Sequence, residues 1–558
     1  MSEPQVVSLL FPPQVPACGS RIGTPNFDDL GITSIVRALD IDQRHSRFIA
    51  GILGTLEQNP ITLHYRQAAL AELLAHPTFV EQLAAILPSL YALAEAGPTA
   101  RWQDNAPLPL VGMRLADLQN YVTVVEQLWN TLDTAAPPLC AQAWLELRAM
   151  LGDMRRDDEY THLVEHLPQL RAQLEQAASV TIGINLDGQL QPESATVLAV
   201  NPYRFNAKSS IVERLIGDRH TADAVRGITA LYKASEGDQR TPEHVLFRDM
   251  NRLLERVAAP VAAILGRYVR ISTTPLTALT GEIVFYIGAA RLWQRLIVQQ
   301  LPCCLPIIVP VSERACTITE TYSLDLVLRT QAADQIVTNN VLFEPDTPIL
   351  MITGPNSGGK TTYGRAIAQA QVMFQAGLFV AAGAAWLSPV DGIFSHFATV
   401  ERPGGSGGRL AEELERIAHI FATATGNSLL IFNEPLSSTD EHSARLLARD
   451  IIGGVQLLRA RTVFITHIYQ LVDELIPSGE QAPGLVSLIA MMLPQRDGAL
   501  TETPAYRIVY GRPRVSEYAH ELAQRYGLSL DQLERALGKR LTASAPDPGV
   551  GDPTSWSA

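Results

Sequence analysis

The 558-residue chain lacks several features that define whole classes of protein. No apolar run is long enough to cross a bilayer, because the most suggestive one, residues 376–387, is short and rich in Ala and Gly, so we expect no membrane span. The first residues contain no basic stretch followed by a sustained apolar core, so we expect no signal peptide. The five cysteines are odd in number and fit no metal-ligand spacing, which is typical of free thiols in a reducing cytoplasm.

Positive charge is also scarce. The chain has 44 Lys and Arg residues against 57 Asp and Glu residues, which gives a formal net charge of −13. This balance argues against a protein coated with basic surface, but it is compatible with a local basic channel. Apolar material is abundant: 47% of the residues are hydrophobic. The length is enough for about three or four domains of typical size.

The stretch from Met351 to Thr362, MITGPNSGGKTT, contains the most specific motif in the chain. It predicts an apolar strand over residues 349–352, then a G-x-x-x-x-G-K-T phosphate loop, then a helix over residues 362–375. Glycines let successive backbone N–H groups turn toward one anion, and the N-terminus of the helix faces the same point. The alternative, a glycine-rich turn without a ligand, is the weaker interpretation of a full match in this context. Lys360 would reach the β- and γ-phosphates and the Thr361 hydroxyl would contact Mg²⁺. The predicted nucleotide-binding residues are Gly354, Pro355, Asn356, Ser357, Gly358, Gly359, Lys360, Thr361 and Thr362.

A second motif lies at residues 428–434, SLLIFNE, which predict a buried strand ending in a polar pair. This pair is usually Asp-Glu, and a carboxylate there can orient and polarise the water that attacks the γ-phosphorus. We assign that role to Glu434. Asn433 precedes it and carries no charge, so we expect it to meet Mg²⁺ through water and hydrolysis to be slow. The alternative is an ordinary strand end.

Two more features accompany these motifs. Residues 463–467, VFITH, predict a strand that ends in His467. Because strand ends converge on the ligand in such sheets, we predict that His467 senses the γ-phosphate, with a structural histidine as the alternative. Residues 404–408, GGSGG, open a helix and by themselves could be a flexible linker. Beside the other motifs they predict a signature loop in which Ser406 contacts phosphate. Since the chain has no second phosphate loop, Ser406 would act in trans on the nucleotide of a second subunit, and we expect a homodimer.

The rest of the chain divides by pattern. Apolar residues recur at helical spacing, with breaks at prolines such as Pro88, and a strand pair at residues 180–200 predicts a small hairpin between helices. Strand and helix patterns then alternate, which predicts an α/β region. The stripes are Phe79, Leu83, Ile86, Leu87 and Leu90, then Leu115, Leu118, Val122, Val125 and Leu128, and then Phe247, Met250, Leu253, Leu254, Val257, Val261 and Leu265. The predicted divisions are an irregular segment (1–30), a helical domain (31–305), a phosphate-loop ATPase domain (306–505), a C-terminal strand and helical element (506–540) and a disordered tail (541–558).

Four stretches, taken in their order along the chain, resemble the ATPase domain of the MutS family of DNA mismatch-repair proteins. They are TGPNSGGKTT, SGGRLAEEL, LLIFNEPLSSTD and FITH. Residues 506–511 and 516–527 resemble the family's C-terminal strand and small dimerising helical element. Arg66-Gln67, with Ala69 and residues 72–74, fits the family's R-Q-x-A-x-x-E-L-L pattern loosely. The resemblance implies an α/β P-loop (ABC-type) ATPase domain fused to an N-terminal, mostly α-helical core and lever domain with a small β-hairpin, and it implies the use of ATP and Mg²⁺.

The resemblance also implies further nucleotide-binding residues, and it shows where this chain departs from the family's pattern. Residues 336–339, IVTN, fit the segment that holds adenine, which makes Ile336 and Asn339 nucleotide-binding. The family usually has an aromatic residue where Ile336 stands, so apolar packing would replace base stacking. The family's mismatch-reading domain would precede the helical core, and we expect this chain to be a shortened form without it. Asn433 stands where the mismatch-repair enzymes carry Asp.

The function that the resemblance implies is that of a cytoplasmic ATPase. It would hydrolyse ATP to ADP and phosphate and couple closure of a homodimer to the binding of DNA by backbone or shape, in DNA repair or recombination. An alternative from another class is a nucleotide-gated scaffold with little hydrolysis that binds a protein partner rather than DNA, which Asn433 and the net charge of −13 favour. A subunit of an ABC transporter fits poorly, because the phosphate-loop variant and the fused helical region are wrong for it.

Overall fold

The computed structural model describes residues 7–13, 15, 23–95, 108–135, 137–175, 179–186, 188–190, 192–201, 203–204, 259–268, 271–330, 332–344, 346–398, 408–476, 484–493, 503–512 and 528–543. The chain divides into two compact units. Unit 1 comprises Met1–Leu9 and His76–Ile283, and unit 2 comprises Leu10–Ala75 and Val284–Ala558. These units follow a different division from the predicted domains, because residues 31–75 belong to the same unit as the sheets.

Unit 1 is built mainly from helices whose apolar stripes are buried. They are α5 (Pro77–Glu95), α6 (Leu108–Asp133), α7 (Gln142–Arg156), α8 (Asp158–Glu175), the 3-10 turn η1 (Gly266–Tyr268) and the first part of α10 (Thr274–Val298). The first two predicted stripes lie on α5 and α6 and are buried apart from half-buried Val122. Of the third stripe, only Val261 and Leu265 fall within the described residues, and both are buried.

One predicted helix break is wrong. Pro88 lies inside α5, which continues to Glu95. A proline inside a helix removes one backbone hydrogen bond. Leu87, Leu90 and Leu93 around it are buried, so the apolar surface that the continuing helix removes from water outweighs that loss.

The predicted hairpin is present in unit 1. Strands β1 (Ser179–Leu186) and β2 (Pro192–Asn201) pair antiparallel, with Val180 opposite Val200. Asn201 Nδ2 donates to Thr181 Oγ1 across the pair at 2.8 Å.

Unit 2 includes four N-terminal helices, α1 (Phe27–Leu30), α2 (Ile32–Leu39), α3 (Ser46–Gly54) and α4 (Pro60–Ala75). They are held to α12 (Lys360–Gln375), the helix that follows the glycine loop. Gln369 Nε2 donates to Leu30 O at 2.7 Å, and Gln375 Nε2 donates to Glu57 O at 2.9 Å. Because the last carbonyls of a helix have no partner within it, the bond to Leu30 O completes the end of α1.

The core of unit 2 contains two sheets. In the six-stranded sheet the order is β12–β11–β6–β10–β9–β8, and every neighbouring pair is parallel except β11 and β12. Its strands are β6 (Ile349–Thr353), β8 (Ile393–Phe397), β9 (Leu429–Asn433), β10 (Arg461–Ile465), β11 (Leu485–Leu493) and β12 (Thr503–Tyr510).

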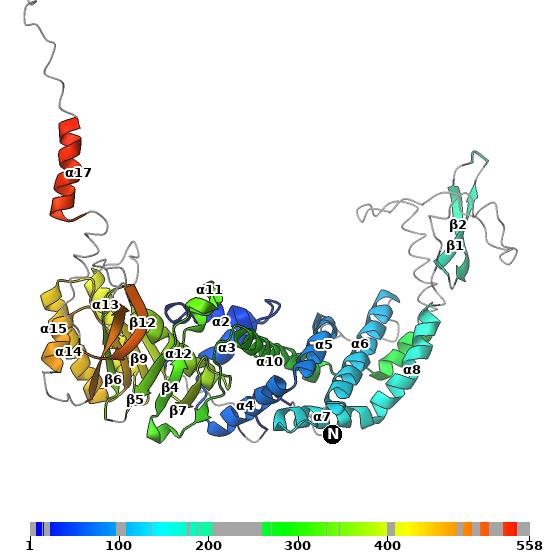
Figure 1. The fold of residues 1–558 in the computed structure, drawn as a ribbon. Helices are drawn as coiled ribbons and strands as arrows, with labels where there is room; N and C mark the ends of the chain where they lie inside the picture. Colours follow the sequence, from blue (N-terminus) through cyan, green and yellow to red (C-terminus); the bar gives the residue numbers. More distant parts are fainter. Residues whose placement is uncertain are drawn as a thin grey trace, which may run out of the picture. The chain divides into compact units, whose positions relative to one another are not determined.

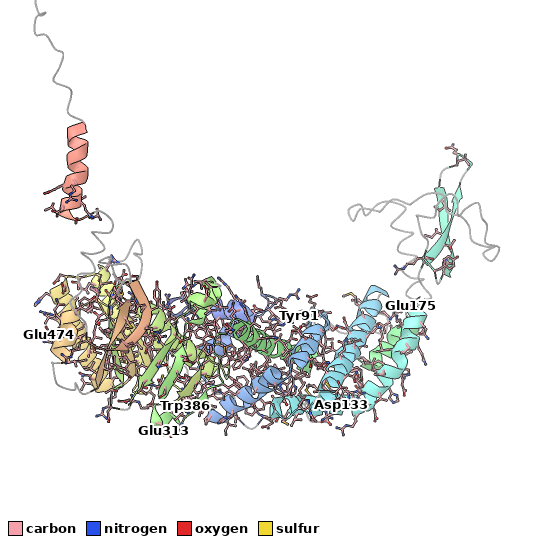
Figure 2. All side chains as sticks on the ribbon, in the orientation of Figure 1. Tyr91, Asp133, Glu175, Glu313, Trp386 and Glu474 are labelled. Carbon is pink, nitrogen blue, oxygen red and sulfur yellow. The ribbon has the colours of Figure 1, made fainter. Side chains whose placement is uncertain are left out.

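The four-stranded sheet has the order β3–β7–β4–β5. Figure 2 draws the side chains, with Trp386 on β7 and Glu474 on α15 (Tyr469–Leu475) labelled. The strands are β3 (Ile307–Ile308), β4 (Cys316–Thr321), β5 (Asn339–Phe343) and β7 (Ala384–Leu387), and the short helices near them are η2 (Val311–Glu313), α11 (Leu324–Thr330) and η3 (Ala333–Gln335).

Helices cover both faces of the six-stranded sheet, which explains why its central strands are almost wholly apolar. On one face, α13 (Arg409–Thr423), α14 (Glu441–Leu458) and α15 share a buried cluster with Met351, Phe432 and Phe464. On the other face lies α12, where a Cβ at Gly364 would be only 3.2 Å from Ile465 Cδ1. Figure 1 shows α12 and α14 on opposite sides of the strands.

The predicted terminal helix is α17 (Leu530–Ala543). It includes residues 541–543, the first three residues of the predicted disordered tail. The first helix-breaking proline, Pro546, comes only later in the sequence. Residues 544–558 lie outside the described part of the chain. In the part that is described, no single helix has the length and hydropathy needed to cross a membrane, although α4 and α5 pass that test as a bent pair.

Candidate functional site

The carboxyl ends of three neighbouring strands bring the predicted motifs to one edge of the sheet. The register places Ile465 of β10 opposite both Ile352 of β6 and Asn433 of β9. The glycine loop follows β6, Glu434 follows β9, and His467 comes two residues after the end of β10. The Glu434 N–H donates to Ile465 O at 2.9 Å, which ties two of these strand ends together.

The glycine loop has a backbone that only glycine can adopt with ease. Gly354 has a φ of +133° and Gly359 a φ of +87°. A Cβ at Gly354 would lie 2.8 Å from Ala490 Cβ, and one at Gly358 would lie 2.7 Å from the same atom. Space and conformation therefore both require glycine in this loop.

Lys360, the first residue of α12, folds back over the loop. Its side chain is 3% exposed, and Nζ donates to Gly354 O at 2.7 Å and to Pro355 O at 2.9 Å. The Glu434 Oε1 atom lies 3.7 Å from the same nitrogen. Burial lowers the pKa of Lys360, and the Glu434 carboxylate opposes that shift. A buried cation is thus placed between the loop and the predicted catalytic carboxylate.

The next residue links the loop to the end of β9. Thr361 Oγ1 donates to Asn433 Oδ1 at 2.8 Å. Glu434 adopts a φ of +50°, which is unusual for a residue with a side chain, and its side chain is 28% exposed. The backbone turn at Glu434 therefore directs a partly accessible carboxylate toward the loop, with the amide of Asn433 beside the threonine.

A cavity of about 410 Å³ lies beside the loop. It is lined by Ile336 and Asn339, the predicted adenine contacts, together with Lys360 and Thr361. Tyr506 of β12 also lines it, and this residue was not among the predicted site residues.

Tyr506 has a φ of +54° and is 49% exposed, and a Cβ at Gly359 would lie 3.4 Å from its ring. Its carbonyl accepts from Asn339 Nδ2 at 3.0 Å, so the pair is held in place. No local signal in the sequence indicates this position, because the pairing joins residues 167 apart.

Two predicted residues are not joined to this group by the described contacts. His467 lies at the end of β10 with an exposed side chain, and it is not among the residues that line the cavity. Ser406 and the rest of residues 399–407 lie outside the described part of the chain. Their predicted roles toward the γ-phosphate stay predictions.

The residues at this edge fit a nucleoside triphosphate and a divalent cation. The close approach of Ala490 excludes a Cβ at Gly354 and Gly358, and the loop offers backbone N–H groups and the Lys360 ammonium to an anion. The cavity volume falls within the range of roughly 300–1,000 Å³ that is usual for small-molecule sites. Thr361 Oγ1 and Asn433 Oδ1 are oxygen donors of the kind that Mg²⁺ prefers.

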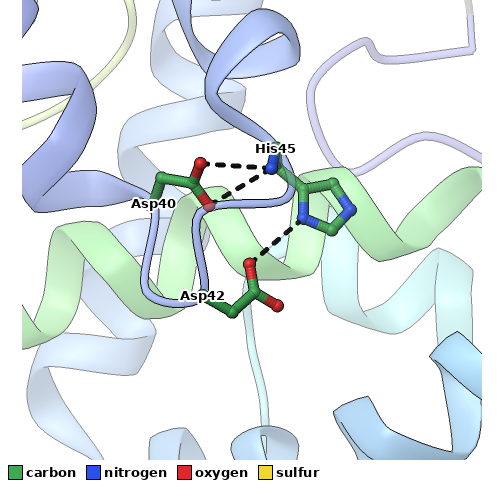
Figure 3. A group of neighbouring side chains, drawn as sticks. All are labelled: Asp40, Asp42 and His45. Carbon is green, nitrogen blue, oxygen red and sulfur yellow. Dashed lines mark hydrogen bonds and ion pairs between the residues drawn. The ribbon is translucent and has the colours of Figure 1, made fainter.

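A separate group of possible metal ligands, Asp40, Asp42 and His45, lies between α2 and α3 (Figure 3). The Asp40 carboxylate already accepts the His45 N–H, at 3.1 and 3.2 Å, and the Ser46 hydroxyl. These bonds satisfy donors at the start of α3, so the local structure explains Asp40 without a metal.

Two regions of the chain match known families. Residues 58–299 match the MutS2 N-terminal domain, and residues 350–490 match MutS domain V. The second region contains the glycine loop, Asn433, Glu434 and His467. The chain therefore carries two regions of MutS-family type, one mostly helical and one that holds the convergent strand ends.

Among characterised proteins, the chain is similar to the DNA mismatch repair protein MutS of several bacteria. It is 31% identical to that of Streptococcus mutans over 212 residues, which are 38% of this chain and 24% of the relative. It is 32% identical to that of Caldanaerobacter subterraneus over 146 residues, 26% of this chain and 17% of the relative. It is 31% identical to that of Clostridium beijerinckii over 206 residues, 36% of this chain and 21% of the relative. The matches thus span a quarter or less of each relative's length.

Proposed function

We propose that this protein is a MutS-like ATPase that binds ATP at the glycine loop and couples its hydrolysis to DNA binding. The observation that carries the proposal is the meeting of two sequence-distant pairs of residues, 360–361 and 433–434, at one sheet edge. Lys360 Nζ lies 3.7 Å from Glu434 Oε1, and Thr361 donates to Asn433 at 2.8 Å. The similarity of residues 350–490 to MutS domain V supports the same assignment.

Each residue has a role that follows from its position. The loop N–H groups and the N-terminus of α12 hold phosphate oxygens, and the Lys360 ammonium exchanges the carbonyls of Gly354 and Pro355 for those oxygens. Glu434 orients the attacking water and accepts its proton. When bound, Mg²⁺ neutralises phosphate charge, and the residues placed to hold it are Thr361 directly and Asn433 through water.

The base is held by the cavity beside the loop. Ile336 packs against it, and Asn339 lies on the same wall. Tyr506 supplies the aromatic ring that position 336 lacks, and the hydrogen bond from Asn339 Nδ2 to the Tyr506 carbonyl holds its backbone beside the cavity. Aromatic rings stack favourably on flat ring systems, so base stacking is restored from β12.

The proposed unit of function is a homodimer. Ser406, which lies outside the described residues, contacts the nucleotide held by the other subunit in this proposal. Closure of the two nucleotide regions then alters how the helical units engage DNA, by backbone or shape rather than base edges. The phosphate contacts of such binding make it weaken steeply with salt.

The test combines two substitutions with a matched control. Lys360→Ala should abolish both ATP binding and turnover, because it removes the buried ammonium from the loop. Glu434→Gln should keep ATP binding and lose turnover by about a hundredfold or more, because an amide cannot take the proton. Glu441→Gln, an exposed change at the start of α14, should leave both intact. Turnover by Lys360→Ala at the unaltered rate would remove the site assignment.

A second candidate function is favoured by one contact. The group that accepts the Thr361 hydroxyl is the neutral amide of Asn433, so the side chain next to the metal position brings no negative charge. A protein that binds ATP, hydrolyses little and engages a protein partner would fit that chemistry. Binding of duplex, mismatched and branched DNA, measured against salt with and without ATP, separates the two candidates. No binding at low salt to any of them would favour the scaffold.

A further inference from the structure

Glu413 is a buried carboxylate on α13 that joins three parts of unit 2. Its side chain is 5% exposed. Oε1 accepts from His396 Nε2 of β8 at 2.9 Å and from the Leu436 N–H at 2.6 Å, and Oε2 accepts from Ser438 Oγ at 2.7 Å. Burial alone would raise the pKa of Glu413, but these three hydrogen bonds lower it to about 2, so the group is an anion at neutral pH.

The two donors on the loop side belong to the segment that begins with Glu434. This segment, residues 434–440, connects β9 to α14. Glu434 has a φ of +50° and Leu436 a φ of +67°, conformations that a residue with a Cβ adopts only under constraint. The constraint at Leu436 is visible: its N–H is held by Glu413, and its side chain is buried in the cluster beneath α13.

The third donor to the Glu413 carboxylate is His396, which contacts it from β8. His396 is 1% exposed, and Nε2 must carry the proton because an ionised carboxylate only accepts. Among the described residues its Nδ1 has no hydrogen-bond partner, so the Glu413 bond is what orients the ring. Glu413 is therefore held by the sheet at His396 and in turn holds the 434–440 segment.

We propose that Glu413 is a positioning residue for Glu434, which sets the turn that presents the catalytic carboxylate. The inference rests on the proposed ATPase function. It deepens that function by naming the buried carboxylate that fixes the backbone conformation of the segment carrying the water-orienting group.

The test uses the full-length protein, with kcat, KM for ATP and nucleotide-binding stoichiometry measured for each variant. Glu413→Ala removes all three bonds, and Ser438→Ala removes one. Glu413→Gln keeps an amide oxygen for His396 and Leu436 and an amide N–H that Ser438 can accept. Glu415→Ala is the control, an exposed glutamate of the same helix. Wild type and Lys360→Ala are run alongside to test the site itself.

Glu413→Ala should lower kcat per ATP-binding site by about tenfold to a hundredfold, since a misplacement near 1 Å can have that effect, while KM for ATP stays close to wild type. The kcat of Ser438→Ala should lie between those of Glu413→Ala and wild type. Glu413→Gln should recover most of the wild-type kcat, and Glu415→Ala should match wild type. A kcat equal to wild type in Glu413→Ala, or a loss that vanishes when rates are expressed per ATP-binding site, overturns the inference. If Glu413→Ala does not fold, a kcat in Ser438→Ala equal to that of wild type overturns the inference. If wild type shows no ATP turnover that the Lys360→Ala substitution abolishes, the proposed function is overturned instead.

Discussion

Arg66 on α4 is the buried cation that holds the N-terminal part of unit 2 to the helix after the glycine loop. It is 1% exposed. Nε donates to Leu10 O at 2.9 Å, Nη1 lies 3.5 Å from Ala376 O at the end of α12, and Nη2 lies 3.9 Å from Glu57 Oε2. The guanidinium also stacks over the Phe11 ring at 4.8 Å. We predict that Arg66→Met destabilises the packing of α4 against α12.

The magnitude follows from what the substitution leaves behind. Removing one partner of a buried ion pair costs about 3–5 kcal/mol, because the other charge stays buried. Glu57 keeps hydrogen bonds from the backbone N–H groups of Gln58 and Asn59, at 2.9 and 2.8 Å, so its carboxylate is partly stabilised without Arg66. We therefore expect the lower end, about 3 kcal/mol. That free energy corresponds to roughly a hundredfold increase in local opening.

The assay is native-state hydrogen exchange followed by mass spectrometry on peptides from α4 and from the C-terminal half of α12. It reports local opening free energies and does not require the whole two-unit chain to unfold in one step. Arg66→Met should exchange about a hundredfold faster in both peptides, and peptides from α14 should exchange as in wild type.

Two further variants control the interpretation. Arg47→Met is the same change at an exposed position of α3, and it should alter stability by less than about 0.5 kcal/mol. Glu57→Gln combined with Arg66→Met should cost less than the sum of the single changes, because the orphaned charge is gone. Unaltered exchange in Arg66→Met, or full additivity in the double variant, would falsify the account of Arg66 as a charge-paired connector.

Three other predictions concern the site. Asn433→Asp keeps an acceptor for Thr361 and adds a charge, so the Mg²⁺ concentration for half-maximal turnover should fall by about tenfold in a Mg²⁺ titration, and an unaltered requirement would refute the placement of the metal. Tyr506→Ala should weaken ATP binding by about 1 kcal/mol in a direct titration, whereas Tyr510→Ala on the same strand should not, and equal effects would refute the stacking role. The pKa of Glu413 is lowered from 4.5 to about 2, so its stabilisation is complete above pH 4.5 and is lost as the pH falls toward 2. The stability gap between wild type and Glu413→Gln in acid unfolding should close over that range, and a constant gap would contradict it.

Much of the local structure was predictable because local patterns have fixed periods. The strand before the glycine loop, the helix after it and the hairpin of β1 and β2 follow from apolar runs and alternation. One error came where burial overrides a local signal. Pro88 reads as a break until the buried leucines around it are known.

The site itself divides in the same way. Lys360, Thr361, Asn433 and Glu434 were identified from motifs, and the parallel sheet explains why they meet, since its strand ends lie at one edge. The sequence did not indicate that Tyr506 lines the cavity, although residues 506–511 resemble a strand of the MutS family. Its backbone is held beside the cavity by a hydrogen bond from the side chain of Asn339 on another strand, a contact without any sequence period.

By itself, the sequence determined the chemistry available at the nucleotide loop: which residues are glycine, which carry an ammonium, a hydroxyl, an amide or a carboxylate. Only the tertiary structure decided that Glu413 holds the Glu434 turn, that Tyr506 lines the cavity, and that residues 27–75 pack with the sheets through Arg66, Gln369 and Gln375. The reason is physical. Local patterning follows from backbone geometry, whereas each of these contacts pairs a buried polar group with a partner far along the chain, and that partner is set by how whole elements pack.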